Sequence, residues 1–202
     1  MLNRYFEATL ENIDFMYANI ALRNVYFALI SLEYILFYPN FEIGLYHDEH
    51  TYYFFHLQSL LTACGNITNI FYNQGSHEKK ESAVRSKRLR DTLGITRANY
   101  PLIFQKEARN TNAHFDERYE EYNGKLGDYN LLHNDTDDGM RQAILSNPHL
   151  RTFDVDNARY ITYDRKGKRI VFDLHQMYQQ LSKMRDQIMQ HPLIDSAWID
   201  SN

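Results

Sequence analysis

The chain has 202 residues, of which 44% are hydrophobic, and it carries a formal net charge of −4. This length and composition suffice for one buried core, so we expect a single domain over residues 1–202. The negative charge excludes a general, charge-driven nucleic-acid binder, and any contact with RNA must therefore be local.

The cysteine count and the apolar segments bear on the compartment. Cys64 is the only cysteine, which excludes an internal disulfide and a cysteine-based metal site. The N-terminal residues lack the basic start and apolar run of a signal peptide. The most apolar stretch, residues 25–38, contains Glu33 and falls short of the roughly 20 residues needed to cross a bilayer. We therefore expect a cytoplasmic protein with no membrane contact.

Apolar residues at alternating steps of three and four predict a first helix from about residue 3 to Tyr38, ended by Pro39. The predicted core stripe consists of Phe6, Leu10, Ile13, Tyr17, Ile20, Phe27 and Tyr34, with Asn24 and Ser31 at the two skipped positions. The same spacing from Tyr53 to Phe71 predicts a second helix, which stops near Gly75. Two long helices with a short connection favour an antiparallel pair.

Two more helices are expected in the first part of the chain. The third runs from about Glu78 to Leu93, and the fourth from about Asn99 to Tyr122, with Gly124 as its stop. The core bundle is thus expected to occupy about residues 1–123.

The remainder, about residues 124–202, is a polar connector, a hairpin and a final helix. Asp135-Thr136-Asp137-Asp138 is expected to cap a short helix through Leu145. These acids could also bind a hard cation, but they lack the alternation and the glycine of a calcium loop. His47, His50 and His56 could also supply metal ligands, but the chain has no zinc-binding spacing. We therefore interpret these three histidines as surface or interface residues and expect no metal and no cofactor.

Residues 160–163 and 170–172 predict a β-hairpin with Gly167 in its turn. Asp173 is the expected N-cap of a last helix that runs to about Gln190. Its apolar stripe comprises Leu174, Met177, Leu181, Met184 and Ile188. The expected fold class is therefore all-α, an antiparallel helical bundle with a small β-hairpin before the C-terminal helix.

The segment from Ala108 to Arg118 holds an arginine, an amide and a histidine that suit phosphate chemistry. Arginine binds phosphate as a rigid, charged fork, and histidine titrates near neutral pH. In a helix, Asn110 and His114 lie on one face and Arg118 continues the row, whereas Arg109 lies about 140° from His114 around the axis.

An arginine with a polar follower, separated from a histidine by four to six residues, resembles the motif of the HEPN superfamily. Composition gives about two such matches by chance, and three occur. The match Arg169 to His175 begins in a predicted strand, and the match that ends at His191 is followed at once by Pro192. Only Arg109 to His114 combines the polar follower with a continuous predicted helix, and the residues from His114 to Arg118 are also similar to HEPN sequences.

The resemblance implies a HEPN-like bundle and a metal-independent endoribonuclease of toxin or phage-defence type. It implies that His114 acts as general base or acid, that Arg109 holds the scissile phosphate and that Asn110 orients either group. It also implies a homodimer with a composite site, a 2′,3′-cyclic phosphate product, and an antitoxin or inhibitor protein as a further partner.

Six cations between residues 77 and 90 form a second candidate RNA contact. Lys87 and Arg88 in this run, together with Arg118, are the expected substrate-binding residues. A solvated helix face is the competing interpretation of the run. The competing function is a non-catalytic helical module that binds a protein or nucleic-acid partner, with Arg109 and His114 in structural roles.

Overall fold

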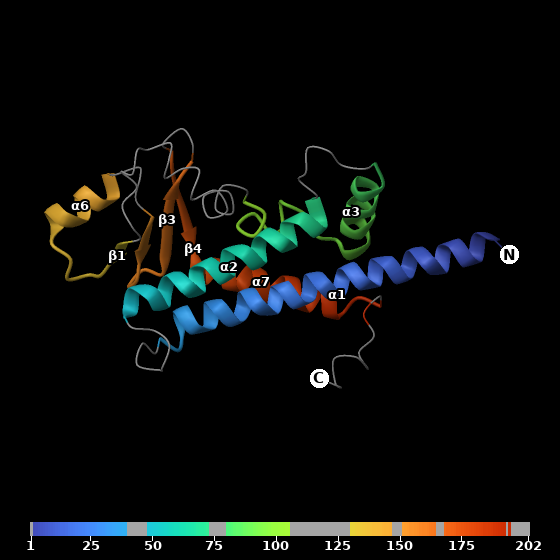
Figure 1. Cartoon of the computed structure of the whole chain (residues 1–202), viewed down its shortest axis with the longest axis horizontal. Coiled ribbons are helices and arrows are strands. Elements are labelled where there is room, and N and C mark those ends of the chain that lie inside the picture. The colour runs from blue at the N-terminus through green and yellow to red at the C-terminus, as the bar shows by residue number, and fades with distance from the viewer. Residues whose placement is uncertain are drawn as a thin grey trace.

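The structure is a computed structural model, and it describes residues 2–39, 48–72, 80–105, 130–146, 151–164, 168–192 and 194. This part of the chain is mostly helical, with five helices and one four-stranded sheet (Figure 1). The expectation of an all-α protein is therefore wrong in its finer form, because two short strands join the predicted hairpin in a sheet.

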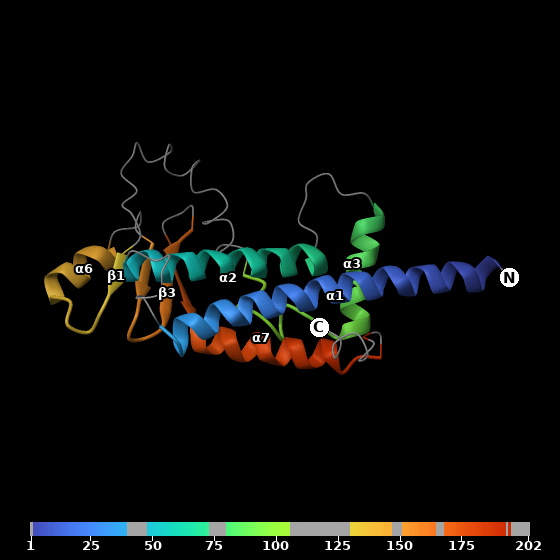
Figure 2. The same cartoon turned by 60° about the horizontal axis from the view of Figure 1, so that its bottom comes forward.

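Three helices lie side by side. Helix α1 spans Leu2–Leu36, α2 spans Glu49–Tyr72 and α7 spans Leu174–Met189. Helix α1 packs against both of the others and runs antiparallel to each, with α2 on one side and α7 on the other (Figure 2). The predicted antiparallel pair is thus confirmed. The buried Tyr52 hydroxyl joins α2 to the end of α1 by donating to the carbonyls of Tyr34 and Tyr38 at 3.0 and 2.9 Å.

Helix α1 is apolar on two faces, and four members of the predicted core stripe lie on the outer one. Tyr17 of that stripe packs against the core, and the side chains of Phe6 and Leu10 lie outside the described residues. Ile13, Ile20, Phe27 and Tyr34 are exposed. The residues that face α2, α3 and α7 are smaller and lie on the other side: Ala18, Ala21, Leu22, Val25, Ala28, Leu29, Leu32 and Ile35. A stripe chosen from the largest apolar side chains passes over alanines. The alanines of α1 are nevertheless buried, because small residues allow close helix packing. For α2 and α7 the predicted stripes are buried, as expected.

Helix α3, Lys80–Leu93, crosses α1 near the end of α2 (Figure 1). It ends at Gly94, whose φ of +64° is accessible to glycine at little cost. The turns of residues 97–104 follow, so the fourth helix predicted from Asn99 does not begin there. The rest of that predicted helix, residues 106–122, lies outside the described residues.

The sheet has the order β1-β2-β3-β4. Strands β3, Arg159–Tyr163, and β4, Arg169–Asp173, form the predicted hairpin, although Gly167 in its turn lies outside the described residues. Strand β2, Thr152–Asp154, pairs antiparallel with β3, and β1, Asn130–Leu132, pairs parallel with β2. Neither of these three-residue strands was expected.

The sheet lies between helices. On one face Phe153, Tyr160 and Phe172 are register partners in the common core, and the Phe153 ring is 4.8 Å from that of Tyr53 on α2. Elsewhere on the sheet the Tyr163 hydroxyl donates to the Leu145 carbonyl of α6, Asp138–Ser146. The predicted cap of this helix is confirmed, because Asp137 accepts from the amides of residues 139 and 140.

Between Ile13 and Leu36, α1 is long and apolar enough to cross a membrane, by length and composition only. The helix therefore exceeds the shorter apolar stretch on which the expectation of no membrane contact rested. In its most apolar window 44% is buried inside the protein, and core helices of soluble proteins pass the same test. The cytoplasmic location stays a prediction.

Candidate functional site

The four residues of the proposed catalytic segment, Arg109, Asn110, His114 and Arg118, lie outside the described residues. The described residues just before this segment are held by hydrogen bonds to two helices, α2 and α7. The Thr68 hydroxyl of α2 donates to the Ile103 carbonyl at 3.3 Å, and the Leu102 amide donates to the Gln180 side chain of α7 at 3.1 Å. Residues 100–105 thus lie between α2 and α7, and the described chain stops four residues before Arg109.

Arg88, one of the expected RNA contacts, forms an ion pair within the protein. Its Nε and Nη2 donate to the Asp14 carboxylate of α1 at 2.5 and 2.7 Å. The Asp14 side chain is 8% exposed and that of Arg88 is 32% exposed. The hydrogen bond to Asp14 raises the pKa of Arg88, so the guanidinium stays charged. This fork-to-fork pair holds α3 on α1 and occupies one of the two guanidinium edges that can bind a phosphate with two hydrogen bonds.

Two more arginines of α3 also contact neighbouring helices. Arg85 donates to the Tyr17 hydroxyl at 2.8 Å and stacks on that ring, and Arg90 bonds the Phe71 carbonyl and lies over the Tyr72 ring. Lys87 differs from them, because its side chain is 72% exposed and pairs only at the surface, with Asp91 at 2.7 Å. Among the cations of this run whose side chains the structure describes, the three arginines are thus packing contacts, and Lys87 lies on the solvent side.

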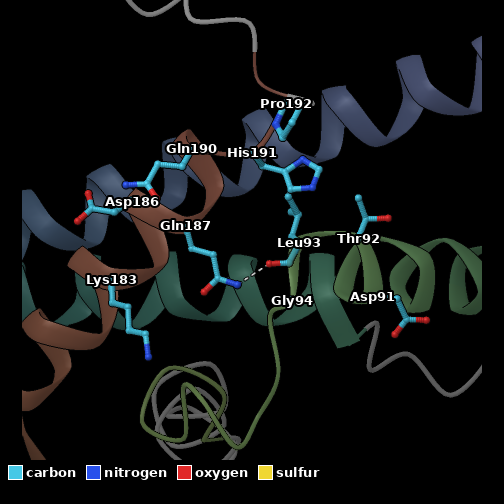
Figure 3. A pocket seen from close by; sticks show the side chains of 10 residues that line it. All are labelled: Asp91, Thr92, Leu93, Gly94, Lys183, Asp186, Gln187, Gln190, His191 and Pro192. Atoms are coloured by element: carbon cyan, nitrogen blue, oxygen red, sulfur yellow. Dashed lines mark hydrogen bonds between the residues drawn. The ribbon is translucent and has the colours of Figure 1, made fainter.

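A shallow pocket of about 760 Å³ opens between the ends of α3 and α7 (Figure 3). Gln187 at its base donates to the Leu93 carbonyl at 2.5 Å and accepts from the Tyr100 hydroxyl. The pocket contains both signs of charge, since Asp91, Asp186 and Lys183 line it. Such a mixture lacks the concentrated positive charge that binds a phosphate backbone. Sequence reasoning missed this pocket because tertiary packing alone brings the two helix ends together.

A groove of about 630 Å³ runs between α1 and α2 and is lined by Phe27, Ile30 and Phe55 among others. His56 forms part of its wall, where its ring stacks on Tyr34 at 4.9 Å and meets Tyr52 edge-on at 4.7 Å. Burial lowers the pKa of His56, which favours the neutral ring. The interpretation of this histidine as a surface residue is wrong, although an interface role stays open.

Within the described residues, no group of three or more histidine, cysteine or acidic side chains could hold a metal ion. Comparisons of the chain with protein-family models, with curated proteins and with solved structures give no match. The HEPN resemblance therefore rests on the Arg109–His114 motif and its predicted helical setting.

Proposed function

We propose that the protein is a metal-independent endoribonuclease with a HEPN-like helical bundle. The observation that carries the proposal is the segment from Arg109 to His114, with its arginine, polar follower and histidine. Support of a coarser kind comes from the mostly helical fold and from its pair of long antiparallel helices.

In the proposed reaction His114 accepts the proton of the RNA 2′-hydroxyl, and the 2′-oxygen attacks the adjacent phosphorus. The bond from phosphorus to the 5′-oxygen breaks, that oxygen takes up a proton, and the products are a 2′,3′-cyclic phosphate and a 5′-hydroxyl. Arg109 neutralises the charge that develops on the phosphate, and Asn110 orients His114 or the phosphate. In the predicted helix, Arg109 lies about 140° from His114 around the helix axis. In the proposed site, the arginine that acts together with His114 therefore comes from a second copy of the chain. An antitoxin or inhibitor protein would restrain such an activity.

The decisive experiment compares RNA cleavage by the native chain and by His114→Ala. We expect the substitution to lower the cleavage rate by about 10²- to 10⁴-fold, which is the usual contribution of general acid–base catalysis. EDTA should leave the native rate unchanged, and the product should carry a 2′,3′-cyclic phosphate.

The two other arginine–histidine matches provide controls within the same chain. His175 is exposed in the first turn of α7, and His191 follows the end of that helix. His175→Ala and His191→Ala should therefore cleave at the native rate. Activity that survives His114→Ala, or that EDTA abolishes, contradicts the proposal.

The second candidate is a non-catalytic helical module that binds a partner protein. It is favoured by one observation, the exposed apolar face of α1. A native chain that cleaves no RNA in the same assay would favour this candidate.

A further inference from the structure

The exposed positions of α1 form a single regular row. Between residues 13 and 37 they fall at steps of three and four only: Ile13, Met16, Ile20, Arg23, Phe27, Ile30, Tyr34 and Phe37. We refer to these eight residues as the α1 seam. Seven of them are large and apolar, and they are between 37% and 60% exposed.

This pattern is the reverse of an ordinary surface helix, whose outward face is polar. Apolar residues at the first and fourth positions of successive heptads, kept up over more than three heptads, are typical of a coiled-coil contact. The described elements touch the α1 seam near its C-terminal end, where Tyr34 stacks on His56 of α2 and Phe37 meets Tyr178 of α7 edge-on. The opposite face of α1 packs on α2 and α7. One helix thus carries two apolar faces, and the seam stays at least 37% exposed at each of its apolar positions.

We propose that the α1 seam is the contact surface between two copies of this chain, packed antiparallel. The area fits such a partner. A large side chain has roughly 200 Å² of accessible surface when it is free. With this value, the exposed fractions of the seven apolar seam residues correspond to about 700 Å² of exposed surface per copy. A standard stable interface buries about 800 Å² per partner. Phe55 of α2, which lines the groove beside Phe27 and Ile30, extends the surface further.

The charge on Arg23 selects the antiparallel direction. In a parallel pair each residue faces its own copy, so two guanidinium groups would meet in one layer and repel each other. An antiparallel alignment centred on residue 25 instead places Arg23 opposite the ring of Phe27 of the second copy, where a cation–π contact forms. The other layers of that alignment join Ile13 with Phe37, Met16 with Tyr34, and Ile20 with Ile30.

This inference rests on the described residues of α1 and does not require the ribonuclease proposal. A sedimentation experiment on the full chain over a series of concentrations tests it. The native chain should reach twice its 24.1 kDa mass. Phe27→Asp/Ile30→Asp should raise the dimer dissociation constant by at least about 100-fold, because it places unpaired carboxylates in the apolar contact. The far-UV circular dichroism of this variant should match that of the native chain, because both side chains are exposed to solvent in a single copy.

Val84→Asp is the matched control, since Val84 is a 56% exposed apolar residue on α3, outside the α1 seam. This variant should remain a dimer. A native chain that is monomeric at every concentration overturns the proposal. A monomer that floats with lipid vesicles overturns it as well, because the α1 seam would then contact a membrane. A dimer that persists in Phe27→Asp/Ile30→Asp overturns it as well.

Disulfide trapping tests the direction. Ile20→Cys/Ile30→Cys should form covalent dimers on mild oxidation, while each single cysteine variant should not, because residues 20 and 30 face each other only in the antiparallel alignment. Crosslinking by the single variants would indicate a parallel pair and overturn the alignment. His114→Ala should sediment as a dimer, so a failed ribonuclease proposal and a failed dimer give different results.

Discussion

At the scale of single residues, the ion pair between Arg88 and Asp14 joins parts of the chain that are 74 residues apart. Its two members differ in environment, since the carboxylate is buried and the guanidinium is partly solvated. Removal of the arginine would leave a buried carboxylate without its main partner, which costs far more than the loss of a surface pair.

We therefore expect Arg88→Met to lower the free energy of unfolding by about 2–3 kcal/mol in urea titrations. The neighbouring variant Lys87→Met removes the same charge from an exposed pair and should change it by no more than about 0.5 kcal/mol. Equal losses in both variants would show that Arg88 is as dispensable to the fold as Lys87.

His56 gives the stability a pH dependence. Its pKa in the folded protein lies below the ordinary value of 6.5, so the unfolded chain takes up the proton first as the pH falls. The free energy of unfolding should thus decrease below about pH 6.5, and the decrease should be smaller in His56→Phe. Melting temperatures between about pH 7 and pH 5 measure this effect. An unchanged slope in His56→Phe would exclude His56 as its origin.

At the scale of elements, sequence patterns predicted most helix boundaries because stop signals are local. Pro39, Gly94 and the Asp173 cap each act within one turn. Strands β1 and β2 have three residues each, which is too short for an alternating pattern, and their parallel pairing joins segments on either side of α6. The faces of α1 could not be assigned because both are apolar, and only the positions of α2 and α7 decide which one is buried.

The N-cap of α7 should make a measurable contribution to the free energy of unfolding. The Asp173 carboxylate accepts from the Gln176 amide at 3.0 Å. Asp173→Ala should lower the free energy of unfolding by about 1 kcal/mol, whereas Asp173→Asn, which can still cap, should keep most of it. Chemical denaturation of both variants provides the test. An equal loss in Asn and Ala would assign the effect to strand β4 instead.

At the scale of the whole molecule, one apolar core runs from α1, α2, α3 and α7 into strands β2 to β4. The described strands thus share their core with the helices, and the expectation of one domain stays a prediction. The segment from Arg109 to His114 lies outside the described residues and stays a prediction from its motif. Local sequence patterns identify such a motif, but they do not show which distant residues the fold would bring next to it.

We expect Phe172→Ala to weaken helices and sheet together. This fully buried ring of β4 belongs to the common core, and its loss should cost about 3–5 kcal/mol. Thermal unfolding followed by far-UV and near-UV circular dichroism should shift as one transition. Val171→Ala, on the exposed side of the same strand, should change the free energy by no more than about 0.5 kcal/mol. Separate transitions for the two signals would show that the sheet unfolds independently.

The single cysteine has a practical consequence. Cys64 is buried in α2, and burial raises the pKa of its thiol to about 12, so alkylating reagents find almost no thiolate in the folded protein. An added surface cysteine can thus be labelled selectively while Cys64 stays in place. In the unaltered chain, the rate of Cys64 modification reports how often the helical core opens.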